Sequence, residues 1–377
     1  MKFKDFKSGV YIDQVKYKSF RPEKINHEWS IDDDNIIVLL SKAERLLGEL
    51  NAYVGLVPQT SFFIRLFLRK EAVASTHLSG NQANIFDSLQ KPEKVETSKK
   101  TDWTDVYNYV NAMNSSFAEI KQEGLSNDVL KNAHLLILNS LREENKSPGV
   151  YRPNQAWVEG DDITDAEYIP PDPAEINDLM IDLDNFVKNQ HYLLPHLIKI
   201  AIIHYQFLTI HPFSEANGRL ARLLTALYLT HHEILQKPVL CLSDYFDKHK
   251  AIYHDTLMSV RQTNNLSKWI IFFLEAVIFS SEDSINIYKK TLEMRKKIVK
   301  TKIVKFGSKT KNANELLQLL FWQPIIETED IISELKVCKN TALNLIYDFV
   351  YLGILVELTG FKRNRIYVFD KYVSLFN

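Results

Sequence analysis

The chain has 377 residues, of which 45% are hydrophobic and 25% charged, and its formal net charge is −1. This length predicts two or three domains of a soluble globular protein, and the near-neutral charge excludes a global attraction to nucleic acid or membranes. The two cysteines, Cys241 and Cys338, exclude a disulfide framework and a cysteine-based metal site, and they fit a reducing, cytoplasmic location.

Regularly spaced apolar residues predict helices along most of the chain between residues 30 and 290, and therefore a mainly α fold. Stripes with the spacing of a helix start at Ile37, Ile64, Leu130, Ile198 and Leu220. The longest apolar run, Trp269–Phe279, contains Glu275 and is too short to cross a bilayer. We expect it to form a buried helix, and we expect no membrane partner.

Residues 155–170 interrupt the helical pattern. A polar centre with glycine and aspartate lies between short β-prone ends, which predicts a β-hairpin or flap on the surface. Three prolines, Pro170, Pro171 and Pro173, end this segment, and a helix is expected to resume near Ala174.

A basic and polar stretch at residues 300–312 predicts the start of a smaller C-terminal domain. Beyond it the pattern indicates a short helix at 330–335, a turn, a helix at 341–351, and strands at 354–358 and 366–369. This order is the outline of a winged helix-turn-helix. We therefore divide the chain into an N-terminal helical region (1–110), a core domain (111–295) and a winged-helix domain (296–377).

The segment from His211 to Arg222, HPFSEANGRLAR, carries most of the chemistry that the sequence suggests. An apolar helix runs into it, and an amphipathic helix leaves it near Asn217, a residue that favours the N-cap position. A free helix N-terminus attracts anions because its N–H groups and its dipole both favour negative charge. Gly218 would let the backbone approach such an anion closely.

Charged side chains in the same segment suit a polyphosphate. Arg219 and Arg222 are three residues apart, so both can project from one side of the first helical turn. Glu215 is a candidate ligand for Mg²⁺, and His211 can accept a proton near neutral pH. Together these residues predict a phosphoryl-type transfer, although each feature alone also occurs in ordinary turns and solvated helix ends.

The segment resembles the signature of the Fic family, H-x-F-x-[D/E]-[G/A]-N-G-R-x-x-R, with every defining position filled. Ala216 stands where glycine is commoner, a mild departure that should leave the loop intact. The similarity extends over most of residues 60–377 through Arg65–Ala72, Gly149–Arg152, Trp157–Val158, Tyr168–Pro171, His204–Phe207 and Leu242–Phe246.

The resemblance implies a helical bundle with a hairpin flap and the transfer of AMP from ATP to a Ser, Thr or Tyr hydroxyl of a protein. It implies that His211 is the catalytic base, that Glu215 holds Mg²⁺ and that Arg222 binds the γ-phosphate. The anion hole and the adenosine contact would be formed by Ala216, Asn217, Gly218, Arg219 and, as a weaker assignment, His249. Ile163 and Tyr168 of the flap would hold the target by strand addition.

Many Fic proteins resemble one another in an inhibitory motif, [S/T]-x-x-x-E-[G/N], whose glutamate pairs with the second arginine of the signature. The matching stretch here begins at Ser75 and has Ser79 at the glutamate position, before Gly80. A neutral hydroxyl cannot form a charge-assisted fork with Arg222, which predicts weaker autoinhibition. The alternative is that Ser79 is an ordinary residue before a glycine cap.

Two other functions stay open at this point. One is a DNA-binding regulator with a vestigial Fic domain, in which basic residues of the winged helix contact phosphates: Lys336, Lys339, Lys362, Arg363 and Arg365. Asp348, Glu357 and Asp370 dilute that charge. The other is transfer of a different phosphate-linked group with the same base and metal ligand. We also expect that the chain can form a homodimer through its helices or its winged-helix domain.

Overall fold

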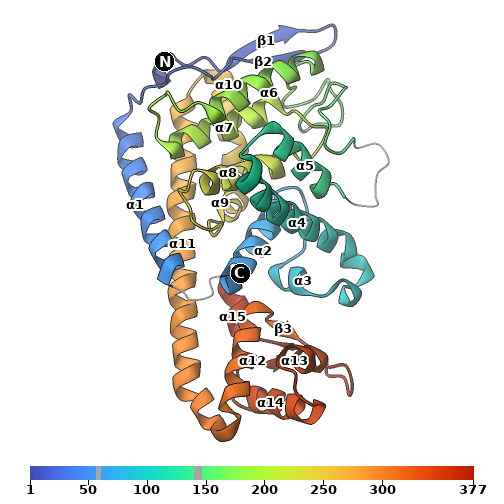
Figure 1. Ribbon diagram of the computed structural model, residues 1–377. Coiled ribbons are helices and arrows are strands. Elements are labelled where there is room, and N and C mark those ends of the chain that lie inside the picture. The colour runs from blue at the N-terminus through green and yellow to red at the C-terminus, as the bar shows by residue number, and fades with distance from the viewer. Residues whose placement is uncertain (57–60, 140–146) are drawn as a thin grey trace.

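A computed structural model describes residues 1–56, 61–139 and 147–377 (Figure 1). The described chain is mostly helical and has two small antiparallel sheets, which confirms the mainly α fold class. Among the described residues, no helix has both the length and the apolar character needed to cross a membrane.

The N-terminal segment and the helical body comprise these elements: η1 (Phe3–Asp5), β1 (Gly9–Asp13), β2 (Lys18–Pro22), α1 (Asp34–Leu56), α2 (Ser61–His77), α3 (Ile85–Leu89), η2 (Pro92–Lys94), η3 (Thr97–Lys99), α4 (Lys100–Glu123), α5 (Asn127–Ile137), α6 (Pro173–Lys188), α7 (His196–Ile210), α8 (Asn217–His231), α9 (Leu242–Lys248), α10 (Lys250–Thr263) and α11 (Leu266–Thr301). The C-terminal unit comprises η4 (Ile303–Lys309), α12 (Thr310–Trp322), β3 (Ile325–Ile326), α13 (Thr328–Leu335), α14 (Lys339–Tyr351), β4 (Val356–Glu357), β5 (Tyr367–Val368), α15 (Asp370–Val373) and η5 (Ser374–Phe376).

Helix α7 is the central helix of the body, and its residues 197–210 are all buried. It is apolar on every side because α6, α8 and α11 surround it, and a helix that is hydrophobic all round is stable only in such a position. The indole N–H of Trp269 in α11 donates to the carbonyl of Ala201 at 2.8 Å. The motif begins at His211, directly after the last residue of this buried helix.

The buried face of α1 differs by one residue from the prediction. Ile36 is fully buried together with Leu40 and Ala43, whereas Ile37 is 50% exposed. Adjacent residues on a helix point about 100° apart, so only Ile36 is in phase with the stripe that packs against α11. The predicted helix is confirmed, and the prediction that Ile37 belongs to its stripe is wrong.

Both predicted domain boundaries fall inside continuous helices. The boundary at 110 lies within α4, and the boundary at 295 lies within α11, a helix of 36 residues that runs along most of the molecule (Figure 1). Helical periodicity does not change where one packed unit gives way to the next, so the sequence carries no signal at those points. The chain turns back at η4, inside the basic stretch 300–312 that suggested the C-terminal boundary.

The flap is a loop rather than a full hairpin. Its two arms form a single antiparallel bridge between Val158 and Tyr168, with backbone N···O distances of 2.8 and 3.2 Å. The Tyr168 side chain is buried, its hydroxyl donates to the Thr209 carbonyl at 2.5 Å, and the Arg261 guanidinium lies 3.7 Å from its ring centre. Ile163 is half-buried within the loop. Tyr168 thus anchors the flap to the end of α7.

The C-terminal unit contains three antiparallel strands in the order β3-β5-β4 and the helices α12, α13 and α14, of which α13 contacts the other two. The sequence predicted two of these strands and missed β3, which has only two residues, Ile325 and Ile326. The assignment as a winged helix stays a prediction. Helix α2 joins this unit to the body, because Phe63 packs against Phe321 and Phe67 packs against Phe376, with ring centres 5.9 and 5.2 Å apart.

Candidate active site

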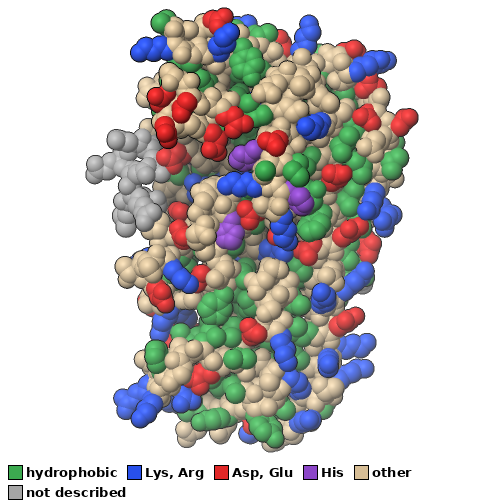
Figure 2. Space-filling model, turned by 180° about the vertical axis from the view of Figure 1, so that it is seen from behind, with side chains coloured by type: hydrophobic (Ala, Val, Ile, Leu, Met, Phe, Trp, Pro, Cys, Tyr) green, Lys and Arg blue, Asp and Glu red, His purple; other side chains and the backbone are tan. Residues whose placement is uncertain are grey.

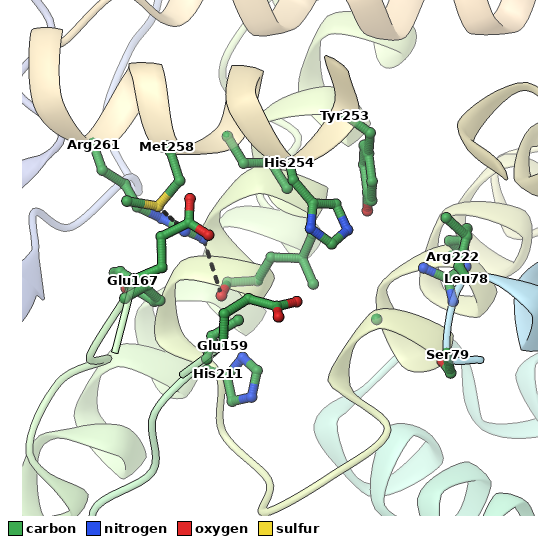
Figure 3. Close-up of a pocket in the computed structure, with 15 residues that line it drawn as sticks. Leu78, Ser79, Glu159, Glu167, His211, Arg222, Tyr253, His254, Met258 and Arg261 are labelled. Atoms are coloured by element: carbon green, nitrogen blue, oxygen red, sulfur yellow. Dashed lines mark hydrogen bonds between the residues drawn. The ribbon is translucent and has the colours of Figure 1, made fainter. Parts of the chain in front are cut away.

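A cavity of about 190 Å³ brings three residues of the motif together (Figure 3). His211, Gly218 and Arg222 line it, with Leu78 and Ser79 from the segment after α2. The remaining walls come from Leu208 of α7, from the flap and from α10. In Figure 3, Arg222 lies beside Leu78 and Ser79, while His211 lies beside Glu159 of the flap. On the face of the molecule drawn in Figure 2, histidine side chains lie among acidic and basic ones.

His211 ends α7 in a left-handed backbone conformation, with φ of 50°. This conformation is uncommon for residues other than glycine, and it persists only where the surroundings hold it. Arg152 supplies that support: its Nε donates to the His211 carbonyl at 2.9 Å, and its backbone N–H donates to the Pro212 carbonyl at 2.9 Å. The buried Arg152 guanidinium also donates to the carbonyls of Asn154 and Pro171. Arg152 therefore holds the motif loop against the residues on both sides of the flap.

The His211 imidazole is neutral over the physiological pH range. Loss of hydration lowers its pKa to about 3, and the nearby positive charges of Arg152 and Arg261 act in the same direction. A backbone hydrogen bond at Leu208 opposes the shift by favouring the charged ring. A neutral imidazole can accept a proton, which is the state that a general base needs.

The side chain of Asn217 closes the motif loop on itself. Its Nδ2 donates to the Phe213 carbonyl at 2.8 Å, and its Oδ1 accepts from the Phe213 N–H at 3.0 Å. Asn217 is the first residue of α8, and Ala216 occupies the N-cap position, so the prediction of Asn217 as the N-cap is wrong. The side-chain amide of Asn217 has both a donor and an acceptor, so it binds the carbonyl and the N–H of Phe213 at once. It is therefore not used to cap the helix.

His134 of α5 holds the motif loop through contacts with Phe213 and Glu215. Its ring stacks on Phe213 with centres 4.1 Å apart, and its Nδ1 accepts from the Gly149 N–H at 2.8 Å. The other nitrogen, Nε2, lies 3.3 Å from the Glu215 carbonyl and must be the donor. Burial lowers the pKa of His134 to about 4, which keeps this tautomer neutral.

The start of α8 is arranged as an anion site. Ala216 has φ of 58°, and within the described ranges no side chain caps the helix, so its first-turn N–H groups keep their capacity to bind a ligand. A Cβ atom at Gly218 would lie 3.1 Å from Nη1 of Arg222, so glycine leaves room for that guanidinium. Arg219 is half-buried, and in the described part of the chain its Nε has no hydrogen-bond partner.

Arg222 is buried and held by uncharged groups. Its Nε donates to Ser75 Oγ and its Nη2 donates to the Ser75 carbonyl, both at 2.8 Å. Tyr253 of α10 contacts the same guanidinium, and the Tyr253 hydroxyl lies 2.8 Å from Nε2 of His204. The second arginine of the motif is thus positioned from α2, α7 and α10 together.

Buried His204 should make the protein sensitive to acid. Burial and the charge of Arg222 lower its pKa to about 3, whereas an unfolded histidine has a pKa of about 6.5. Between these values only the unfolded chain binds the proton, so stability falls as pH falls from 6.5 toward 3, by at most about 1.4 kcal/mol per pH unit. A His204→Gln variant should lose this part of the slope in urea unfolding at pH 4 to 7. Exposed His191→Gln serves as the control, and equal slopes for His204→Gln and the unmodified chain would contradict the assignment.

Glu215 is exposed at the tip of the loop and is not among the residues that line the cavity. In the described ranges no group of three acidic, histidine or cysteine side chains forms a metal site. A single carboxylate nevertheless fits Mg²⁺, which commonly uses one or two carboxylates, substrate phosphates and waters. Glu215 therefore suits a metal that arrives with a nucleotide rather than one bound by the protein alone.

The other predicted site residues, Ser75, Ser79 and His249, lie in three different environments. Ser75 is buried against Arg222, and Ser79 is exposed at the cavity edge. His249 lies at the junction of α9 and α10, where its ring packs 4.1 Å from Tyr245, and it is outside the cavity lining. His254, five residues later in α10, lines the cavity.

Sequence reasoning missed several residues that shape the site. Arg152 and His134 hold the motif loop, and Tyr253, His254 and Arg261 line the cavity from α10. Arg152 lay in a stretch of family resemblance, which was a usable signal. His134 had the spacing of an ordinary core residue, and only the fold brings it to Glu215, 81 positions away.

Comparisons with known proteins identify the family of the chain. Residues 37–118 match the model of the Fic/DOC family N-terminal region, and residues 124–229 match the Fic/DOC family model, which here includes the whole motif. The chain belongs to the Fic family.

Two curated Fic relatives are named protein adenylyltransferase Fic. The protein from Aedes aegypti is 35% identical over 77 residues, and that from Drosophila virilis is 25% identical over 206 residues. These matches cover 20% and 52% of this chain but only 14% and 39% of the relatives, so the chain spans well under half of their length.

Solved Fic structures share the fold. A Fic family protein from Desulfovibrio desulfuricans G20 superposes with a TM-score of 0.60 at 17% identity and covers 91% of this chain and 98% of its own. Fic-1 from C. elegans gives a TM-score of 0.51 at 20% identity over 69% of this chain and 74% of its own. At these identities the likeness concerns the fold alone.

Proposed function

We propose that this chain is a protein adenylyltransferase, which moves AMP from ATP to a hydroxyl group of a target protein and releases pyrophosphate. The observation that carries the proposal is the meeting of neutral His211, Gly218 and Arg222 in one cavity at an uncapped helix start. The adenylyltransferase names of the curated relatives support the same reaction.

In the proposed reaction, the free ring nitrogen of His211 takes the proton of the target hydroxyl. That oxygen forms a bond to the α-phosphorus of ATP, the bond to the β-phosphate oxygen breaks, and pyrophosphate leaves. The first-turn N–H groups of α8 and Arg219 stabilise the charge on the α-phosphate, and Arg222 binds the γ-phosphate. Glu215 would hold Mg²⁺, which supplies charge neutralisation on the phosphates.

The flap supports a target that enters as an extended segment. Val158 and Glu159 line the cavity beside His211, so a strand aligned with this arm would bring a side-chain hydroxyl toward the imidazole. The single Val158–Tyr168 bridge already uses the N–H and carbonyl of both residues. Target pairing by the backbone is therefore expected in the arm beyond them, which includes Ile163, and Tyr168 acts as the anchor.

Incubation with ATP labelled on the α-phosphate should test the proposal. We expect Mg²⁺-dependent incorporation of label into the chain itself or into proteins of a cell extract, with a mass increase of one AMP on a Ser, Thr or Tyr residue. Parallel reactions with UTP and with CDP-choline test the rival transfers of uridylyl and phosphocholine groups. Labelling from either of these donors, and none from ATP, would replace AMP transfer by the corresponding reaction.

The C-terminal unit keeps DNA binding as a prediction. Lys336, Lys339, Lys362 and Arg363 are exposed, whereas Arg365 is engaged with Glu357 at 3.3 Å. Four exposed cations on one small unit are compatible with phosphate contacts, and they are equally compatible with an acidic protein partner.

A further inference from the structure

A second cavity lies at the junction of the helical body and the C-terminal unit. It has a volume of about 810 Å³ and shares no lining residue with the cavity at His211. Its walls come from α2, from α3 and α4 with the segment between them, from β3 and the start of α13, and from the loop between β4 and β5. Figure 2 shows the surface hollowed between the upper body and the lower C-terminal unit. The volume is within the range of small-molecule sites, about 300–1,000 Å³.

Two arginines of α2 project into this cleft from one face of the helix, four residues apart. Arg69 is only 8% exposed; its Nη1 donates to the Ser88 carbonyl, while its Nε has no partner among the described residues. Arg65 is half-buried; its Nη1 donates to the Trp322 carbonyl at 3.3 Å, and its guanidinium lies 5.2 Å from the Trp322 ring centre. Both guanidinium groups are held by uncharged partners.

The described part of the chain offers no counter-ion to this pair of positive charges. Within the described ranges, no carboxylate forms an ion pair with Arg65 or Arg69. Burial lowers the pKa of Arg69 to about 10, and the charge of Arg65 acts in the same direction. Buried charges without a partner are costly, and truly unpaired ones are rare in folded proteins. An anion seated between the two arginines would remove that cost.

The other charges of the cleft largely balance one another. Lys91 pairs with Asp330 at 2.8 Å, and Lys94 pairs with Glu327 at 3.3 Å, so these contacts tie the body to α13. Glu96 and Arg363 also line the cleft with opposite charges. The net surplus therefore resides at Arg65 and Arg69, and it is positive.

An aromatic surface lies beside the arginines. Trp103 and Tyr107 of α4 both line the cleft, and their rings stack with centres 4.9 Å apart and planes at 14°. Tyr107 is 40% exposed, so its ring can accept a further planar group. A phosphate on the arginines and a base against the aromatic ring are the two halves of a nucleotide site.

We propose that the cleft between α2, α4 and the C-terminal unit is a second ligand site, which binds a nucleoside phosphate through Arg65, Arg69 and Tyr107. It is separate from the site of the proposed transfer reaction. Helix α2 carries the arginines in its first half and Ser75, the holder of Arg222, in its last turn. A ligand in the cleft would therefore contact the same helix that positions the motif arginine.

The test uses the full chain with 5-fluorotryptophan and an Arg219→Leu change that weakens nucleotide binding at the motif. Trp103 lines the cleft and Trp322 contacts Arg65, while Trp157 precedes Val158 of the cavity at His211. The ¹⁹F NMR signals, assigned by Trp→Phe changes, therefore report the two places separately. We expect AMP to shift the Trp103 and Trp322 signals. An added Arg69→Leu change should weaken this binding at least about tenfold, whereas Arg45→Leu on exposed α1 should leave it unchanged.

Arg65→Leu, at a less buried position, is the second variant, so the test stands if Arg69→Leu does not fold. Absence of shifts at Trp103 and Trp322 at millimolar AMP would overturn the proposal. Equal affinity for inorganic phosphate and AMP would overturn its nucleoside part, and binding of a single-stranded oligonucleotide but not of AMP would overturn its small-molecule part.

Discussion

A His211→Asn variant is expected to lose AMP transfer by about 10²–10⁴-fold, the contribution that a positioned general base commonly makes. Asparagine is chosen because it tolerates the left-handed conformation of residue 211, where φ is 50°. The loop should therefore keep its contacts with Arg152, and only the proton acceptor is lost. The measurement is the initial rate of incorporation of label from α-labelled ATP.

His191→Asn is the matched control, since this histidine is exposed and lies outside the cavity. The midpoint temperature of thermal unfolding of both variants should lie close to that of the unmodified chain. Because the pKa of His211 is about 3, kcat/KM for the unmodified chain should show no loss from protonation of this ring between pH 8 and 5. A folded His211→Asn variant with full transfer activity would show that another group removes the proton.

A Ser79→Glu variant is expected to lower the transfer rate by about 10–100-fold, which corresponds to about 1.5–3 kcal/mol for a hydrogen bond between charged groups. Ser79 lies at the edge of the same cavity as Arg222. A carboxylate there would form a charge-assisted fork with the guanidinium and would compete with the γ-phosphate for it. The rate should recover partly at high ATP concentration, because the two anions exclude each other.

Ser79→Gln provides the matched control, because glutamine has the size of glutamate without its charge. We expect this variant to transfer AMP at nearly the rate of the unmodified chain. If both variants were slowed equally, bulk at position 79 rather than charge would be responsible. If neither were slowed, the idea that Ser79 releases a brake on Arg222 would be wrong.

The part of the site that is contiguous in sequence was predictable, because its chemistry follows from local order. His211, Gly218 and Arg222 lie within 12 positions, and the helix that starts after Ala216 brings Gly218 and Arg222 to one side. The residues that hold this segment were not predictable in the same way. Arg152 reaches the His211 carbonyl across 59 positions, and a buried arginine looks like any other until the fold supplies its acceptors.

The fold was predictable where periodicity is strong and uncertain where it is weak. The apolar α7 and the amphipathic α8 were both found, whereas the two-residue strand β3 has no period to detect. His249 was assigned from its resemblance to a family position, and at the turn between α9 and α10 its ring lies against Tyr245. His254, five residues later, lines the cavity, and the direction of each ring depends on packing rather than on composition.

The hydrogen bonds of Arg222 to the uncharged hydroxyl and carbonyl of Ser75 have a kinetic consequence. Among the described residues, a hydroxyl and a carbonyl orient this guanidinium and no carboxylate forms an ion pair with it, so no ion pair there has to break when ATP arrives. Nucleotide association should therefore proceed in one step, without a slow preceding rearrangement, and its observed rate constant should rise linearly with ATP concentration.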